Sequence, residues 1–280
     1  MKKTLIDFED FLKSNDTSIF ESFHPYFQDA FWEMVVNGGK RFRPSLLFSV
    51  VLAHRKEKIK DSFYIALALE VLHTYSLIHD DLPAMDNSPL RRGHTTLHIK
   101  YDECGAILAG DALNTYAFHL ISNSNFSDKI KVEITKSLSF SALKMLLGQA
   151  CDCYFENKKL SKDKVDFIHL NKTAALIASS LEIGGIIALL DENAIKKLKF
   201  FGTKLGLYFQ IRDDVLDSTS VESIEGKPTN NDTSKNSYVN LLGIEKAKET
   251  KEKLKNELLL ELNTMQDNIQ KNLKELLQSY

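Results

Sequence analysis

Three aspartates stand where a long apolar stretch of the sequence ends. Asp80, Asp81 and Asp86 lie at or just beyond the end of residues 66–82, which are rich in Ala, Leu, Val and Ile. Because such a stretch is typical of a buried helix, these acids are not simply the wet face of a surface helix. Pro83 lacks a backbone N–H and disfavours helix at the residue before it, so Asp86 is expected on a loop.

A second acidic cluster, Asp213, Asp214 and Asp217, also ends an apolar helical stretch. Asp213 and Asp217 are four residues apart, so on a helix their carboxylates project from one face and can flank a cation. Crowded carboxylates repel one another, and acids at a helix C-terminus oppose the helix dipole, so a purely structural role would be costly. Mg²⁺ removes that cost, because it binds one or two carboxylates together with phosphate oxygens and water. The two clusters therefore suggest a diphosphate held through Mg²⁺.

Basic residues accompany both clusters along the chain. The segment GGKRFRP at 38–44 places cations just before an apolar helix, whose exposed N–H groups would add to an anion site. Two arginines follow Asp86 in the same loop, and the planar guanidinium fork suits phosphate oxygens. Alone, each cation is more often a solvated surface residue, and a lone histidine more often a core residue, but their joint placement favours anion binding. The residues concerned are Lys40, Arg43, His73, Arg91, Arg92, Lys172, Lys227 and Lys235.

Nearly every segment repeats apolar residues at three- and four-residue spacing, which predicts an all-α protein, a single large helical bundle. No strand pattern is evident, and residues 83–96 and 220–236 are expected to be loops because they are rich in Pro, Gly, Asn and charged residues. The predicted helices are 3–13, 20–36, 43–55, 61–82, 98–121, 128–157, 162–189, 191–219, 238–264 and 266–278.

Composition limits the possible classes of protein. The chain has 280 residues without a Pro/Gly/Ser-rich linker, so one domain spanning 1–280 is predicted. A net charge of -2 argues against nucleic acid as a partner. The longest apolar run, 183–190, is far below the ~20 residues that span a bilayer, so no stable membrane insertion is expected. Three cysteines and no legible signal peptide favour a reducing, cytoplasmic location.

Taken together, these motifs resemble the all-α trans-isoprenyl diphosphate synthases, and among them the bacterial farnesyl diphosphate synthases. Either acidic motif alone would be weak, but both in this order with GKRFRP and LRRG are specific. The resemblance covers most of the chain and implies a helical bundle of the isoprenoid synthase type with a central apolar cavity. The landmarks are GGKRFRP (38–44), SLIHDDLPAMD (76–86), LRRG (90–93), AGDALNTYAF (109–118), GQACD (148–152), NKTAALI (171–177), FQIRDDVLD (209–217) and GK…DTSKNSY (226–238).

The resemblance also implies an activity and its partners. The expected enzyme is a magnesium-dependent prenyltransferase of isoprenoid biosynthesis. It joins isopentenyl diphosphate head to tail with dimethylallyl and geranyl diphosphate, giving farnesyl diphosphate. More than one Mg²⁺ ion bound with the allylic diphosphate, small-molecule isoprenoid diphosphates as ligands, and a homodimer are all implied.

Individual roles follow from the matched motifs. Asp80, Asp86 and Asp213 are expected to bind Mg²⁺, and their neighbours in the motifs to orient or support them. Thr173 and Gln210 are expected to stabilise the allylic cation through their dipoles, beside the catalytic Lys172. Tyr75, with Ser76, is expected to limit chain length, because Tyr75 lies somewhat over one helical turn before Asp80. The full assignment is metal, Asp80, Asp81, Asp86, Asp213 and Asp217, supported by Asp214; isopentenyl diphosphate, Lys40, Arg43, His73 and Arg92; allylic diphosphate, Arg91, Lys172, Lys227 and Lys235.

Other functions remain open at this stage. A geranylgeranyl diphosphate synthase would differ only in the depth of its apolar tunnel. A terpene cyclase shares the helical fold but would not need the GKRFRP-type second diphosphate site. A non-catalytic subunit that binds prenyl diphosphates would not need the full set of acids and cations.

Overall fold

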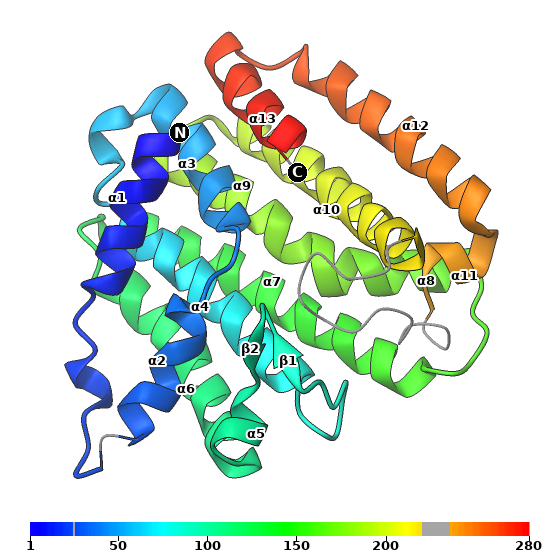
Figure 1. Ribbon diagram of the computed structural model, residues 1–280. Coiled ribbons are helices and arrows are strands. Elements are labelled where there is room, and N and C mark those ends of the chain that lie inside the picture. Colours follow the sequence, from blue (N-terminus) through cyan, green and yellow to red (C-terminus); the bar gives the residue numbers. More distant parts are fainter. Residues whose placement is uncertain (25, 220–235, 280) are drawn as a thin grey trace. The chain divides into compact units, whose positions relative to one another are not determined.

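The computed structural model describes residues 1–24, 26–219 and 236–279. These residues fall into two compact units, which are described separately. The N-terminal unit contains Met1–Ser45 and Glu57–Lys131, and the C-terminal unit contains Leu46–Lys56 together with residues 132–219 and 236–279. Figure 1 shows that both consist almost wholly of helices, which confirms the all-α prediction. A single domain over 1–280 stays a prediction.

The N-terminal unit is built around two long helices, and three further helical elements contain residues of both units. The elements of the N-terminal unit are α1 (Lys2–Lys13), η1 (Ser18–Phe20), α2 (Tyr26–Val36), α4 (Phe63–Asp80), β1 (Leu90–Arg91), β2 (His94–Thr95), α5 (Leu97–Lys100) and α6 (Glu103–Ser122). The elements with residues in both units are α3 (Phe42–His54), η2 (Lys56–Lys58) and α7 (Asp128–Phe155).

The remaining helices belong to the C-terminal unit. A π-helical turn joins two of them into one continuous helical stretch, as the sequence predicts for 162–189. The elements are α8 (Lys162–His169), the π-helical turn η3 (Leu170–Ala174), α9 (Ala175–Ile187), α10 (Glu192–Thr219), α11 (Tyr238–Leu242), α12 (Ile244–Leu262) and α13 (Asp267–Ser279).

The core of the N-terminal unit forms where α4 packs along α6. Ile65, Leu67 and Leu69 on α4 are fully buried, although Leu67 points away from the helix face that Ile65 and Leu69 share. A helix that is apolar on all sides must be enclosed by its neighbours, which is the arrangement predicted for this stretch. Each such side chain contributes about 1.5–3 kcal/mol through burial. The first acidic cluster thus begins at the end of a rigid helix.

The core of the C-terminal unit centres on α10, which packs against α9, η3 and α12. The approach to η3 is close: a Cβ atom on Gly206 would lie 2.4 Å from the Cα of Ala174. Only glycine permits that contact, and it seats the second acidic helix directly against the π-helical turn. Leu205, Phe209 and Ile211 fill the buried side of α10.

Several predicted boundaries were wrong, and each difference has a local cause. The predicted helix 98–121 is two helices, because the side chain of Asp102 caps the second one by accepting a hydrogen bond from Gly105 N at 2.5 Å. The predicted helix 238–264 is interrupted at Gly243, whose φ is 83°. The helix predicted for 61–82 ends at Asp80, before Pro83.

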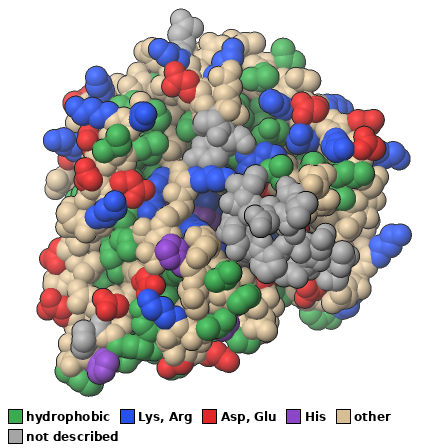
Figure 2. Space-filling model, viewed as in Figure 1, with side chains coloured by type: hydrophobic (Ala, Val, Ile, Leu, Met, Phe, Trp, Pro, Cys, Tyr) green, Lys and Arg blue, Asp and Glu red, His purple; other side chains and the backbone are tan. Residues whose placement is uncertain are grey.

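The surface carries both signs of charge. On the face drawn in Figure 2, Lys and Arg side chains are interspersed with Asp and Glu side chains. This mixing agrees with the small net charge of -2. Within the described ranges, none of the helices is both long enough and apolar enough to span a membrane.

Candidate functional site

The first acidic motif folds back on itself where α4 ends. Asp81 caps the helix, and the N–H of Asp86 donates a hydrogen bond to the carbonyl oxygen of Asp80 at 2.8 Å. Ser88 N–H donates in the same way to Asp81 at 3.2 Å. The turn therefore brings Asp80 and Asp86 together although six positions separate them. Both side chains are half-buried, which suits carboxylates that bind Mg²⁺ while part of its shell is water or phosphate.

Asp81 and Arg91 form a buried ion pair. Asp81 is only 2% exposed and Arg91 5% exposed. Arg91 Nη2 lies 2.5 Å from Asp81 Oδ1, and its Nε lies 3.0 and 3.1 Å from the two carboxylate oxygens. Burial works against the charge on Arg91, but Asp81 outweighs it, so the pKa of Arg91 is raised. The sequence assigned Asp81 to the metal site and Arg91 to the allylic diphosphate; here each also binds the other, and both assignments stay predictions.

A short hairpin presents the two arginines of LRRG. Leu90 pairs with Thr95 and Arg91 with His94 in antiparallel register. The two turn residues both have positive φ, 55° at Arg92 and 79° at Gly93, as a type I′ turn requires. The expectation of no strand was wrong, because two-residue strands are too short to leave an alternating pattern.

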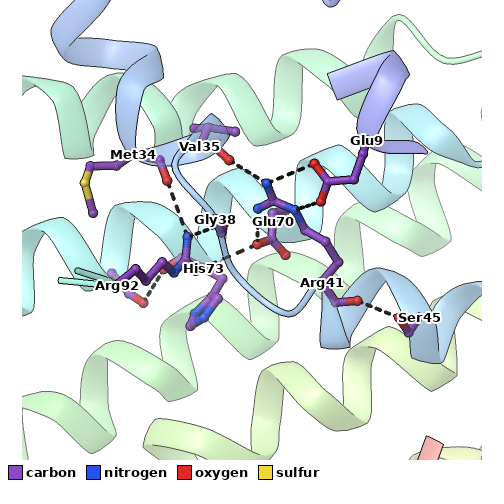
Figure 3. A network of polar contacts seen from close by, with 10 residues as sticks. Glu9, Met34, Val35, Gly38, Arg41, Ser45, Glu70, His73 and Arg92 are labelled. Atoms are coloured by element: carbon purple, nitrogen blue, oxygen red, sulfur yellow. Dashed lines mark hydrogen bonds and ion pairs between the residues drawn. The ribbon is translucent and has the colours of Figure 1, made fainter. Parts of the chain in front are cut away.

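Arg41 anchors the GGKRFRP loop from within. Its side chain is buried and donates to Glu9 Oε1 at 2.7 Å, Glu70 Oε1 at 2.8 Å and the carbonyl of Val35 at 3.0 Å (Figure 3). Sequence analysis named no role for Arg41. Glu70, an acid inside an otherwise apolar stretch, was the signal that a buried cation partner was needed.

Arg92 contacts the same loop from the hairpin (Figure 3). Its Nη1 donates to the carbonyl oxygens of Gly38 at 3.1 Å and Met34 at 3.4 Å, and its Nη2 lies 3.8 Å from Glu70 Oε1. The structure thus places Arg92 against the GGKRFRP loop, whose Lys40 and Arg43 the sequence grouped with it as one anion site. Lys40 is exposed on this loop.

His73 lies beside these arginines, as Figure 3 shows for Arg41 and Arg92. Burial, and then the positive charges of Arg43, Arg92, Arg91 and Arg41, hold its pKa well below 6.5. The imidazole is therefore neutral at pH 7 and available as a hydrogen-bond donor. The arginines add to the effect of burial, and four positive charges near one histidine suit the binding of an anion.

Tyr75, predicted to limit chain length, is a buried residue of α4, and that role stays a prediction. It is 3% exposed, and its hydroxyl finds no hydrogen-bond partner among the described residues. Burial, then Asp80 and Asp111, raise its pKa to about 12. The ring packs edge-on against His79 at 5.5 Å. Ser76 donates its hydroxyl to the carbonyl of His73 at 2.8 Å, so it is engaged with its own helix.

The second acidic motif lies in the last turns of α10. The Asp213 side chain is 53% exposed and lies 2.7 Å from Arg212 Nη2. Asp214 is half-buried and accepts hydrogen bonds from Gln210 Nε2 at 2.9 Å and from the N–H of Tyr238 at 2.8 Å. Asp217, one turn after Asp213, is also half-buried. Asp213 is thus the most exposed of the three.

Thr173 and Gln210, predicted as a pair, are in contact. The Thr173 hydroxyl donates to Gln210 Oε1 at 2.8 Å. Thr173 lies in the π-helical turn, a feature often found at functional sites. The structure therefore brings the two predicted dipoles together, while their role stays a prediction.

Lys172, also in this turn, forms an ion pair with Asp152 at 2.6 Å. Both are half-buried. Asp152 stands in the GQACD landmark, but the sequence assigned it no function. Its position twenty residues before Lys172 gives no pattern from which the pair could be deduced.

Two predicted residues, Lys227 and Lys235, lie outside the described residues. Within 1–24, 26–219 and 236–279, no three His, Cys, Asp or Glu side chains converge as a metal site made of protein groups alone. Mg²⁺ does not require one, because it commonly takes one or two carboxylates and completes its shell with phosphate and water. The Asp80 and Asp86 turn supplies that kind of donor pair.

Known proteins are similar to this chain over most of its length. The profile of the Polyprenyl synthetase family matches residues 24–277. Farnesyl diphosphate synthase of Micrococcus luteus is 40% identical over 277 residues, 96% of this chain and 94% of that protein. Farnesyl diphosphate synthase of Geobacillus stearothermophilus is 42% identical over 219 residues, 76% of this chain and 73% of that protein.

A solved structure is similar over nearly the whole length. The crystal structure of geranyltransferase from Helicobacter pylori, complexed with magnesium and isoprenyl diphosphate, has a TM-score of 0.94 and 49% sequence identity. The match covers 99% of this chain and 95% of that one. The chain, with its two acidic motifs and its arginine-rich loops, belongs to the Polyprenyl synthetase family.

Proposed function

We propose that this protein is a prenyltransferase that condenses isopentenyl diphosphate with dimethylallyl and then geranyl diphosphate, giving farnesyl diphosphate. The observation that carries the proposal is the arginine cluster around neutral His73, in the same unit as the Asp80 and Asp86 turn. One site binds a diphosphate through cations and the other through carboxylates with Mg²⁺. Two differently built diphosphate sites suit two diphosphate substrates.

The isopentenyl diphosphate is bound by the arginine cluster. Arg43 and Arg92 supply charge and planar donors, Lys40 adds an exposed cation, and His73 donates a neutral hydrogen bond. Arg41 is held by Glu9 and Glu70 and fixes the loop rather than meeting the ligand. Because Arg41 already fixes the loop through Glu9 and Glu70, the anion site is preorganised before substrate binds.

The allylic diphosphate is the proposed ligand of Mg²⁺ held by aspartates of the acidic motifs, and Arg91 and Lys172 are its proposed cationic contacts. When bound, Mg²⁺ neutralises the charge that develops on the departing diphosphate. Asp80, Asp86 and Asp213 are the proposed ligands, with Asp81, Asp214 and Asp217 in support. Lys227, and Lys235 with it, would add cations to the same diphosphate.

The reaction breaks the C–O bond between the allylic carbon and its diphosphate, which leaves with the electron pair. Thr173 and Gln210 direct the negative ends of their dipoles at the resulting cation without offering a nucleophilic charge. The isopentenyl double bond then forms the new C–C bond. One proton is lost to the released diphosphate, which restores a double bond and balances the charge.

Product length is set by Tyr75, whose buried ring lies one turn before the first aspartates. We expect Tyr75→Ala to shift the main product from fifteen to twenty carbons, because the ring no longer stops the growing tail. Chromatography of dephosphorylated products measures this shift. A wild-type product of twenty carbons would favour the geranylgeranyl alternative instead.

The activity is tested with purified protein, isopentenyl diphosphate, each allylic primer and Mg²⁺. A fifteen-carbon diphosphate supports the proposal. Cyclic hydrocarbon would indicate a terpene cyclase, and binding of both substrates without condensation would indicate a non-catalytic subunit. Chelation of Mg²⁺ is expected to abolish turnover and its return to restore it.

We further infer a homodimer and a cytoplasmic location. Phe140, Leu143, Leu147 and Tyr154 form an apolar stripe on α7 at spacings of three, four and seven, and all are exposed. A second copy of this chain would cover the stripe. Light scattering tests this, with Leu143→Glu expected to give monomers. An odd set of three cysteines, Cys104, Cys151 and Cys153, fits a reducing compartment better than a disulfide framework.

A further inference from the structure

Asp214 differs from the exposed Asp213 beside it in how its carboxylate is used. Oδ1 accepts from Gln210 Nε2 at 2.9 Å, and Oδ2 accepts from the backbone N–H of Tyr238 at 2.8 Å. Both oxygens are therefore engaged by protein donors. This carboxylate holds other protein groups in place rather than being left open to a ligand.

The contact with Asp214 fixes which way the Gln210 amide points. An ionised carboxylate only accepts hydrogen bonds, so the NH₂ group of Gln210 must face Asp214. Its Oε1 atom then faces Thr173, whose hydroxyl donates to it at 2.8 Å. Asp214 thereby determines which group donates and which accepts in the hydrogen bonds that run from Tyr238 through Gln210 to Thr173. If Asp214 moved, the amide could rotate and the dipole could reverse.

Tyr238 is held rigidly by groups other than Asp214. It is 1% exposed, and its hydroxyl donates to Asp166 Oδ1. Its ring stacks on His169 at a centroid distance of 5.3 Å and an interplanar angle of 25°. Just before it, Asn236 Nδ2 donates to the carbonyl of Phe155 at 2.9 Å. Burial, and then the bond to Asp166, raise the pKa of the phenol, which keeps it a donor.

These anchors come from three different helices. Phe155 ends α7, Asp166 and His169 belong to α8, and Asp214 lies on α10, all in the C-terminal unit. Tyr238 itself begins α11, a helix of only five residues. So short a helix has little stability of its own. The position of the Tyr238 N–H therefore depends on the buried side chain.

We propose that Tyr238 is a positioning residue for the condensation: its hydrogen bond to Asp166 holds its own N–H on Asp214, and Asp214 orients Gln210 and Thr173 towards the allylic cation. The inference rests on the proposed function. It adds Tyr238 and Asp166, to which the proposed function gives no substrate or metal contact, to the residues that set the rate. It predicts a loss in kcat without a matching change in KM for isopentenyl diphosphate.

The test is Tyr238→Phe, which keeps the stacked ring and removes only the hydroxyl. Asp166 keeps Lys162, 2.5 Å away, so the fold is not left with a lone buried charge. We expect kcat to fall roughly tenfold, as for loss of a supporting contact behind a ligand-binding group. Asp166→Ala should act alike, whereas Asp166→Asn, which keeps an acceptor, should retain most of the rate.

A matched control exists in the other unit. Tyr101 also donates its hydroxyl to a carboxylate, Glu33 Oε2, at 2.6 Å. Tyr101→Phe removes the same kind of bond, and its kcat should stay at the wild-type value. Comparable unfolding midpoints for both variants would show that a difference in kcat is not a difference in folding.

A double-mutant cycle with Gln210→Ala distinguishes positioning from a general structural role. If Tyr238 acts through Gln210, Tyr238→Phe should lower kcat no further once Gln210→Ala is present. Independent, multiplicative losses would overturn the inference, and so would a wild-type kcat in Tyr238→Phe. Absence of condensation by the wild-type protein would overturn the proposed function and this inference with it, so the two failures are distinguishable.

Discussion

The two acidic clusters each contain a pair of adjacent aspartates, but different protein groups hold the second aspartate of each pair. In each, two aspartates are adjacent, and the second one binds protein groups. Asp81 binds the charged Arg91 in a buried ion pair, whereas Asp214 is held by the neutral donors of Gln210 and Tyr238. The comparison teaches that in each adjacent pair the second carboxylate is held by protein groups, while the first, Asp80 or Asp213, is the proposed Mg²⁺ ligand.

The largest effect is expected from removing a carboxylate that faces the ligand. Asp80→Ala and Asp213→Ala should each lower kcat/KM about a thousandfold, or about 4 kcal/mol, because the charge of the departing diphosphate loses its metal-binding partner. Steady-state assays at several Mg²⁺ concentrations measure this. Glu133→Ala, at a surface ion pair with Lys136, is the control and should be unchanged. Near-normal activity in either aspartate variant would remove that cluster from the metal site.

The next effect tests the anchoring aspartate of the first cluster. Arg91→Ala should lower the free energy of unfolding by about 3 kcal/mol, because it removes the guanidinium that pairs with the buried Asp81 carboxylate. Urea unfolding measures it. The double variant Asp81→Ala/Arg91→Ala should recover part of that loss, since the buried carboxylate is then removed as well. A double variant less stable than either single variant would contradict this, because it would show that the Asp81–Arg91 pair contributes net stability to the fold.

Sequence patterns predicted the frame of the fold well, because long helices with buried faces leave a periodic signal. The stretch that became α4 and the π-containing stretch 162–187 are examples. The same patterns missed the LRRG hairpin, whose register depends on two residues with positive φ. They also missed the helix cap at Asp102, because nothing in the sequence around this aspartate separates it from the many aspartates that do not cap a helix.

The sequence named candidate site residues, whose roles stay predictions, and it predicted only one of their side-chain pairings, Thr173 with Gln210. Motif order grouped Arg91 with the ligands, yet whether Arg91 meets a phosphate or Asp81 depends on a loop that folds back only in three dimensions. Thr173 and Gln210 could be paired because each is a neutral dipole beside a charged motif. Tyr238 could not, because its contribution passes through a backbone N–H that every residue possesses.

Stability near the second cluster is expected to depend on pH through His169, which stacks on Tyr238. Burial lowers the pKa of His169 to about 4, against an ordinary value of 6.5. Between those values the unfolded chain binds the proton and the folded protein does not, so stability falls as pH falls. The slope from this group is about 1.4 kcal/mol per pH unit.

His169→Gln should remove that slope. Urea unfolding at pH 7, 6 and 5 measures the difference between the wild type and the variant, which isolates His169 from other groups. His94→Gln, at an exposed position, is the control. Equal slopes for wild type and His169→Gln would mean that His169 gains its proton in the folded state.

The smallest effect is expected from the exposed counterpart of the Arg91 pair. Arg212 lies 2.7 Å from Asp213, close to the 2.5 Å that separates Arg91 from Asp81, so distance alone would predict equal strength. Because the Asp213 side chain is 53% exposed, water screens its charge, and Arg212→Ala should cost less than about 1 kcal/mol. Urea unfolding of Arg212→Ala and Arg91→Ala under the same conditions compares the two losses in the free energy of unfolding. If both variants lost equal stability, burial would not be what separates the two clusters, and Asp213 would be an anchor like Asp81 rather than the carboxylate that faces the ligand.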